Sequence, residues 1–172
     1  MEELIKVPEE RIGVIIGPKG SVRKKIEKKS KSKIVVDSEY GDVTIEGEGE
    51  DFFKAASVIK AIARGFSPER AFKLFQDDYT LKIIDITEYT GKSTATQKAK
   101  RGRVIGRGGL TRTEIEKKTH SMVSVYGKTI SIIGLQQDIE SAEEAIDMLL
   151  NGAKHATMER YLERETTEHF KL

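Results

Sequence analysis

Two short glycine loops have the residue types and spacing that suit the binding of a phosphate backbone. They are Gly17-Pro18-Lys19-Gly20 and Gly106-Arg107-Gly108-Gly109. Because glycine has no Cβ, such a loop allows a tight turn between two helices and the close approach of another backbone. The helix that follows directs free N–H groups and its positive dipole end toward the loop. Lys19 and Arg107 add full charges, so each loop is predicted to hold an anionic chain.

Positive charge is also concentrated around the loops. Arg23 and Arg112 lie three residues after the last glycine of their loops, about one helical turn into the next helix and within reach of the same bound strand. The net charge is only +2, so the distribution is more informative than the total. Basic residues dominate positions 11–33 and 98–118. These two clusters could attract a polyanion such as a nucleic acid. The alternative interpretation is that they are ordinary solvated helix faces without a binding role.

The two loops belong to an internal repeat. A shift of 89 positions aligns the loops and their surroundings, namely Gly13 with Gly102, Ile16 with Ile105, Arg23 with Arg112, Ile26-Glu27-Lys28-Lys29 with Ile115-Glu116-Lys117-Lys118, and Val36 with Val125. After a two-residue gap the match resumes, with Val43, Ile45 and Gly47 opposite Ile130, Ile132 and Gly134. A run of this length indicates a duplication.

Periodicity predicts the same element order, β-α-α-β-β-α, in both copies. The first copy has expected strands at 4–7, 33–37 and 42–46, and helices at 8–16, from the loop to about 29, and at 50–64. The second has expected strands at 81–86, 122–126 and 129–133, and helices from Ser93 or Thr94 to 105, from the loop to about 118, and at 136–151. Each copy is thus predicted to be an α+β unit, in which three helices cover one face of a three-stranded antiparallel sheet.

The helix after each loop has an expected apolar side, formed by Val22 and Ile26 in the first copy and by Leu110 and Ile115 in the second. Gly65 and Gly152 follow the last helices as expected C-caps, with a position inside a longer helix as the alternative for Gly152.

Two segments lie outside the repeat. Ser67-Pro68-Glu69 is a helix-start signal for residues 68–75, whose apolar side is formed by Ala71, Leu74 and Phe75. The segment from Ala153 to about Glu165 is expected to form a helical C-terminal extension anchored by Tyr161 and Leu162. The predicted organisation is therefore a first domain at 1–66, a helical connector at 67–78, a second domain at 79–152 and a helical tail at 153–172.

The two loops, each between two short helices and followed by a hairpin and a long helix, resemble the signature of K-homology (KH) domains. The element order is similar to the type I, or eukaryotic, arrangement. This resemblance implies that each copy clamps about four unpaired nucleotides, with the bases on an apolar groove. For that groove the candidates, which are equally candidates for the core, are Ile16, Ile26, Val36, Ile105, Ile115 and Val125. The low aromatic content, 6%, fits a module that does not stack bases on aromatic rings.

The whole chain resembles the archaeal rRNA-processing KH proteins of the partner-of-Nob-one and Krr-one family. That resemblance implies binding near the 3′ end of pre-16S rRNA, with a Nob-type endonuclease or the alpha subunit of translation initiation factor two as partner. Eukaryotic members generally have a degenerate first loop, whereas Gly17 and Gly20 are both present here. Because the second loop has three glycines and Arg107, we expect it to be the main RNA contact.

Other classes of function find little support in the residues. The chain has no cysteine, and its three histidines are scattered, so neither a metal ligand set nor a catalytic nucleophile with its base is predicted. Gly91-Lys92-Ser93-Thr94 lacks the earlier glycine of a phosphate-binding P-loop, because position 86 is isoleucine. No apolar stretch is long enough to span a membrane, so a cytoplasmic protein without cofactors is expected. A protein-interaction scaffold with weak RNA affinity and a single-stranded DNA binder remain as alternatives.

Overall fold

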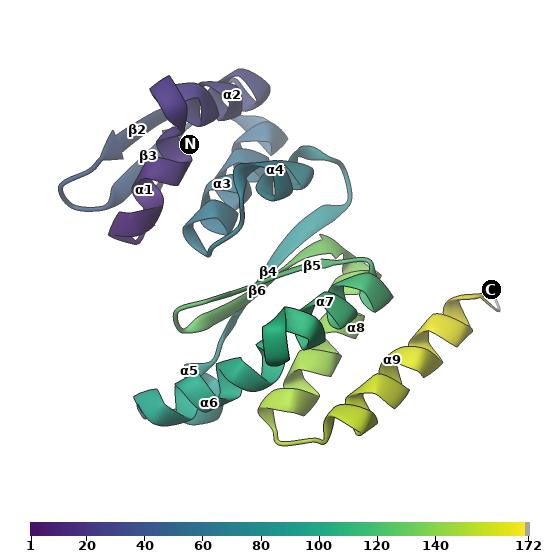
Figure 1. Ribbon diagram of the computed structural model, residues 1–172. Coiled ribbons are helices and arrows are strands. Elements are labelled where there is room, and N and C mark those ends of the chain that lie inside the picture. The colour runs from purple at the N-terminus through teal and green to yellow at the C-terminus, as the bar shows by residue number, and fades with distance from the viewer. Residues whose placement is uncertain (171–172) are drawn as a thin grey trace. The chain divides into compact units, whose positions relative to one another are not determined.

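The computed structural model describes residues 1–170, with side chains described as far as Glu168. The chain forms two compact units, Met1–Leu81 and Lys82–Leu172, which we call unit 1 and unit 2 and consider separately (Figure 1). The expected α+β class and the three-stranded antiparallel sheet of each copy are confirmed.

Unit 1 follows the order predicted for the first copy. Its elements are β1 (Glu2–Lys6), α1 (Glu9–Ile16), the 3₁₀ turn η1 (Pro18–Gly20), α2 (Ser21–Ser30), β2 (Lys33–Asp37), β3 (Asp42–Glu46), α3 (Gly49–Ala63), α4 (Pro68–Ala71) and η2 (Phe72–Phe75). The sheet order is β1-β3-β2, with Val43 of the central strand opposite Ile5 and Val36. Val43 and Ile45 point toward the helices and are fully buried, as the alternation along β3 requires.

Unit 2 repeats this arrangement with one addition. Its elements are β4 (Tyr79–Asp85), the short helix α5 (Thr87–Thr90), α6 (Thr94–Ile105), the 3₁₀ turn η3 (Arg107–Gly109), α7 (Leu110–Thr119), β5 (Met122–Tyr126), β6 (Thr129–Leu135), α8 (Gln136–Leu150) and α9 (His155–Phe170). The sheet order is β4-β6-β5. Ser93 caps α6 by accepting a hydrogen bond from the N–H of Thr96, as expected. Sequence periodicity did not predict α5, which has a single turn and no apolar face of its own.

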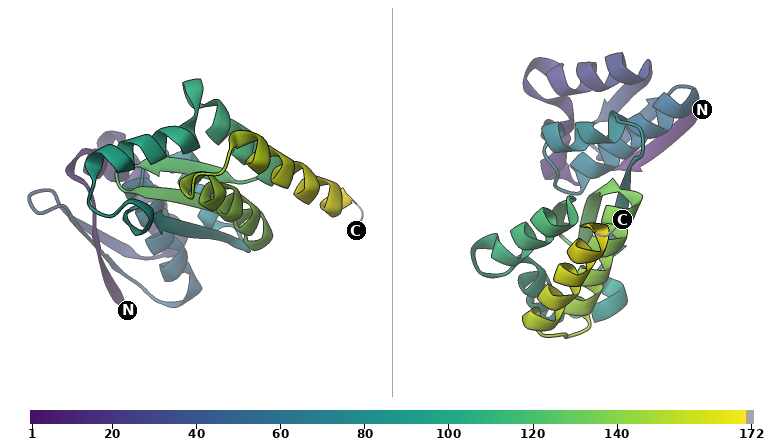
Figure 2. Two further views of the ribbon diagram at one scale, coloured as in Figure 1. Left: turned by 90° about the horizontal axis from the view of Figure 1, so that it is seen from below. Right: turned by 90° about the vertical axis from the view of Figure 1, so that its right-hand side faces the viewer.

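An extra helical segment follows the last helix of each repeat. In unit 1 the segment α4–η2 packs on α3, and in unit 2 α9 packs on α8 and α7, as Figures 1 and 2 show for α9. Ala71 and Leu74 are the buried hydrophobic residues of the first segment, and Met158 and Leu162 are those of the second. Gly65 and Gly152 stand before them with φ of 100° and 92°. In each unit a helical segment after this glycine thus packs on the last helix of the repeat.

Candidate nucleic-acid interface

The two glycine loops have the same backbone conformation. The first glycines, Gly17 and Gly106, have φ/ψ of 73°/172° and 74°/175°. The last glycines, Gly20 and Gly109, have 73°/16° and 78°/10° and stand directly before α2 and α7. Five of the eight loop residues have positive φ on glycine, where the absence of a Cβ avoids strain. The duplication has therefore preserved one three-dimensional loop twice.

The first glycine of each loop serves the packing of the protein itself. A Cβ at Gly17 would lie 2.4 Å from Cγ2 of Val22, and a Cβ at Gly106 would lie 2.1 Å from Oγ1 of Thr111. Both distances are far below van der Waals contact. The helix before the loop can approach the helix after it only because these positions carry no side chain. The steric demand at the first position is thus a demand of the fold.

The later loop positions face open space. A Cβ at Gly20 would approach only Cε of Lys24, at 3.9 Å, and a Cβ at Gly109 only Nη2 of Arg112, at 3.9 Å. No heavy atom comes within 4 Å of the corresponding position at Gly108. Lys19 and Arg107 occupy different loop positions: Lys19 is the third residue of its loop, and Arg107 is the second residue of its own. The outward side of each loop is therefore bare backbone bordered by cations, which an incoming phosphate chain could approach closely.

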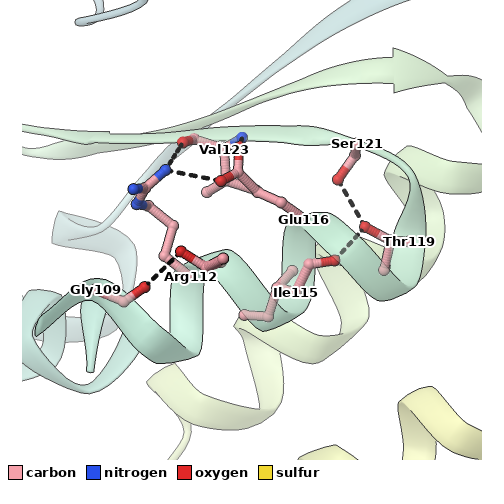
Figure 3. A network of polar contacts seen from close by, with 8 residues as sticks. Gly109, Arg112, Ile115, Glu116, Thr119, Ser121 and Val123 are labelled. Carbon is pink, nitrogen blue, oxygen red and sulfur yellow. Dashed lines mark hydrogen bonds and ion pairs between the residues drawn. The ribbon is translucent and has the colours of Figure 1, made fainter. Parts of the chain in front are cut away.

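Arg112 joins α7 to the edge strand β5 (Figure 3). Its Nη1 donates to Oε1 of Glu116 at 2.8 Å and to the carbonyl oxygen of Val123 at 3.4 Å. Oε2 of Glu116 accepts the N–H of Val123 at 3.0 Å. This network holds the guanidinium next to the loop, with about a third of the side chain exposed.

Unit 1 has a looser form of this arrangement. Arg23 Nε lies 3.5 Å from Oε1 of Glu27, whose Oε2 accepts the N–H of Ile34 at 3.2 Å. Each glutamate therefore replaces a missing strand partner for an edge N–H group, while it fixes the arginine in place. The sequence predicted both arginines beside the loops. The repeat also aligns Glu27 with Glu116, four residues after each arginine, but no role was predicted for these glutamates.

The apolar candidates separate into core and surface. Ile26 and Ile115 are fully buried and belong to the core. Ile16, Ile105, Val36 and Val125 are half-buried, on the helix before each loop and on the edge strand opposite. They remain accessible enough for contact with a base. Whether such a side chain lies in the core or at the surface depends on how deeply it lies beneath the helices. The periodicity of the sequence does not contain this information.

Leu110 corrects one sequence expectation. It was placed on the apolar side of α7, but its side chain is 70% exposed. Thr111, only 8% exposed, occupies the position that Val22 has in unit 1. Val and Thr have nearly the same shape, so Thr111 can fill the space beside Gly106. Leu110 becomes an exposed apolar residue directly after the second loop, a feature that the 89-residue alignment of Thr111 with Val22 would have revealed.

Several basic residues near the loops stabilise the fold instead of a ligand site. Arg11 donates from Nε to the carbonyl oxygen of Ile62 at 2.8 Å and from Nη2 to that of Phe66 at 2.7 Å, at the end of α3. In unit 2, Lys100 and Arg103 donate to carbonyl oxygens at the end of α8, including that of Leu150. These cations satisfy helix C-terminal carbonyls and complement the helix dipole. A simple charge count therefore overstates the charge available at the loops.

The shifted pKa values lie away from the loops. A hydrogen bond of 2.6 Å to Asp147 raises the pKa of Tyr89 to about 12. A hydrogen bond to Asp77 raises the pKa of Lys54, and one from Thr87 lowers the pKa of Asp85. Over the described residues, no cluster of His, Asp or Glu could hold a metal ion, and no helix has the length and apolarity of a membrane span.

Comparison with known proteins agrees with this geometry. A model described as a eukaryotic type KH domain (type I), of the PNO1 second-domain kind, matches residues 80–167, and a KH domain model matches residues 2–61. Both describe KH domains, an RNA-binding family and not an enzyme family.

Individual relatives include archaeal and eukaryotic proteins. KH domain-containing protein MJ0443 of Methanocaldococcus jannaschii is 44% identical over 95% of this chain and 73% of its own length. Pre-rRNA-processing protein pno1 of Aspergillus fumigatus is 29% identical over 62% of this chain, which spans only 40% of that protein. A chain in the crystal structure of the a/eIF2alpha–aDim2p–rRNA complex from Pyrococcus horikoshii OT3 is 45% identical, with a TM-score of 0.91 over 98% of this chain and 95% of that one. The chain therefore belongs to the type I KH-domain family, as a tandem KH protein of the PNO1 and Dim2 group.

Proposed function

We propose that this chain binds single-stranded rRNA through both glycine loops, near the 3′ end of pre-16S rRNA, during maturation of the small ribosomal subunit. The observation that carries the proposal is the pair of loops with the same backbone conformation, whose last glycines face open space beside basic side chains. The relatives named for pre-rRNA processing and for an rRNA complex support the choice of RNA. We propose that the chain is divided into two KH domains, 1–66 and 79–152, with a connector at 67–78 and a tail at 153–172.

In this proposal the loops hold the backbone and the neighbouring strand edge receives the bases. The residues that contact phosphate are Gly17, Pro18, Lys19, Gly20, Arg23, Gly106, Arg107, Gly108, Gly109 and Arg112. First-turn N–H groups of α2 and α7 point toward the bound phosphates. Half-buried apolar side chains on α1 with β2, and on α6 with β5, support the bases.

The second loop is proposed as the main contact. Gly108 leaves its third position without a side chain, so a backbone can approach closely there. Leu110 adds an exposed apolar surface next to it, where unit 1 has Ser21. In the first loop, Lys19 provides charge, but its side chain leaves from the third position.

The proposed protein partners are the alpha subunit of the archaeal initiation factor two and a Nob-type endonuclease. The first is supported by the Pyrococcus horikoshii complex, which contains a/eIF2alpha, aDim2p and rRNA. The endonuclease follows only from the family resemblance. Both would act with the chain in the cytoplasm.

Replacing Arg107 and Gly108 with aspartate tests the second loop. The double variant should keep its fold, because both positions point outward and aspartate tolerates the left-handed angles of Gly108 (φ 61°, ψ 21°) at a cost of roughly 1–2 kcal/mol. It should lose most of its affinity for a single-stranded 16S rRNA 3′-end oligonucleotide in a filter-binding titration. The matched change at Pro18 and Lys19 should have a smaller effect. A DNA oligonucleotide of the same sequence shows whether the clamp selects RNA. If the wild-type protein binds neither oligonucleotide, the proposal is wrong and the protein-interaction scaffold is the interpretation that remains.

A further inference from the structure

A row of lysines runs along the outward face of α2 in unit 1. Lys24 and Lys28 are one helical turn apart, and both are exposed on the side opposite the buried Ile26. Lys25 and Lys29 form a second row beside them. We call these four residues the lysine face. In the part of the chain that the structure describes, neither Lys24 nor Lys28 is paired with a carboxylate.

Two of the lysines are positioned by aromatic rings of the connector. Nζ of Lys25 lies 4.7 Å from the ring centroid of Phe72, and Nζ of Lys29 lies 5.6 Å from that of Phe75. Such cation–π contacts hold the ammonium groups at the surface without neutralising their charge. A counterion can therefore meet two cations whose positions are already restricted.

The fold itself does not require the lysine face. Positions 24, 25, 28 and 29 correspond in unit 2 to Thr113, Glu114, Lys117 and Lys118. There Lys118 lies 3.4 Å from Glu114 and 3.7 Å from Glu163, so that its charge is compensated. The same helix thus forms without four clustered cations. Like charges one turn apart destabilise a helix, so α2 carries this cluster at a cost to its own stability.

We propose that the lysine face binds the phosphate backbone of a base-paired RNA segment that directly flanks the single strand held by the first loop. The face adjoins that loop, because Cε of Lys24 lies 3.9 Å from the Cβ position of Gly20. It is the outer surface of one helix and carries cations with no exposed ring for base stacking. Such a surface recognises phosphates and not bases. A duplex presents dense phosphate charge with its bases hidden, which matches this chemistry. The inference rests on the proposed RNA binding and adds a second ligand element to it.

Two RNA probes separate the lysine face from the loops. The first is a single strand of about ten nucleotides, enough for two clamps of about four each. The second is the same strand joined to a hairpin of about 16 base pairs, the length spanned by known duplex-binding domains. The variants are K24Q/K28Q and, as a control with the same loss of charge, K92Q/K98Q, whose lysines are exposed on unit 2.

Wild-type protein should bind the hairpin probe more tightly than the single strand. K24Q/K28Q should lose most of that gain and bind the single strand within about twofold of wild type. Its plot of log affinity against log salt for the hairpin probe should be less steep by about 1.4 to 1.8, as expected for two lost phosphate contacts. Its melting temperature should be equal or higher, because like-charge repulsion is removed. The control should retain the gain.

The inference is wrong if K24Q/K28Q retains the hairpin gain, if the control loses as much, or if the wild type shows no gain. Failure of the proposed function looks different. In that case the wild type would ignore the single strand, whereas hairpin binding that depends on Lys24 and Lys28 would still support the lysine face.

Discussion

The Cβ position of Gly106 lies 2.1 Å from Oγ1 of Thr111, so these two residues can coexist only while position 106 is glycine. Gly17 and Val22 have the same relationship in unit 1, at 2.4 Å. In both loops the first glycine therefore allows two helices to meet, whereas the last glycine leaves the outward surface open. The single motif thus combines a packing requirement with a binding surface, and substitutions can distinguish the two.

Alanine at position 106 should destabilise unit 2 far more than alanine at position 109. Gly109 has left-handed helical angles, which cost an L-residue roughly 1–2 kcal/mol, whereas Gly106, at φ 74° and ψ 175°, lies in a region that is essentially restricted to glycine. Only Gly106→Ala adds a steric clash, so its total cost should exceed about 2 kcal/mol. Hydrogen exchange of the buried Ile130 and Ile132 amides reports the stability of unit 2. Equal protection in the two variants would contradict the division of roles between the glycines.

Lys19→Gly should weaken RNA binding without loss of stability. Lys19 has φ of 54°, a conformation that glycine adopts freely, so the change should leave the unfolding free energy equal or raise it by about 1 kcal/mol. The loss of charge should lower affinity for single-stranded RNA several-fold. Lys31→Gly is the matched control, since Lys31 has φ of 52° at the opposite end of α2. If both variants bind the single strand equally well, Lys19 does not contact RNA.

Substitutions at Arg112 and Glu116 should change RNA affinity in opposite directions. Arg112→Gln removes a cation beside the loop and should weaken binding. Glu116→Gln keeps an acceptor for the N–H of Val123 but removes a carboxylate that repels phosphate, so binding should become about twofold tighter. Glu114→Gln has the same charge change on the same helix and should have less effect. Filter-binding titrations at one salt concentration measure all three, and weaker binding by Glu116→Gln would show that the glutamate acts mainly by orienting Arg112.

Tyr89→Phe should remove a pH-dependent part of the stability of unit 2. The phenol donates to Asp147 in the folded state, with a pKa of about 12 instead of the usual value of about 10. This contribution is complete below about pH 10 and is lost as the pH rises through about 12. The difference in unfolding free energy between wild type and variant should shrink over that range.

Local rules were enough to predict the architecture from the sequence. Glycine spacing and hydrophobic periodicity depend on neighbours along the chain. The 89-residue repeat supports the prediction further, because the same element order is predicted twice. For the same reason the caps at Ser67 and Ser93, whose hydroxyls accept from N–H groups three residues later, could be predicted. The choice of glycine at 17, 20, 106 and 109 is likewise visible in the sequence, although its division into packing and surface roles is not.

Only the tertiary structure decided which apolar and basic side chains are exposed and so available to bind RNA. Leu110 and Thr111 are adjacent, and only the position of α6 determines that Thr111 is buried against Gly106 while Leu110 is exposed. Arg11 and Arg103 lie in basic stretches, yet each reaches the end of a helix that is distant in sequence and donates to carbonyl oxygens there. Among the described residues, Lys24 and Lys28 have no such acceptor, and their charge stays at the surface. A count of charged residues cannot distinguish these cations. The carbonyl oxygens that bind Arg11 and Arg103 come close to them only when the chain folds.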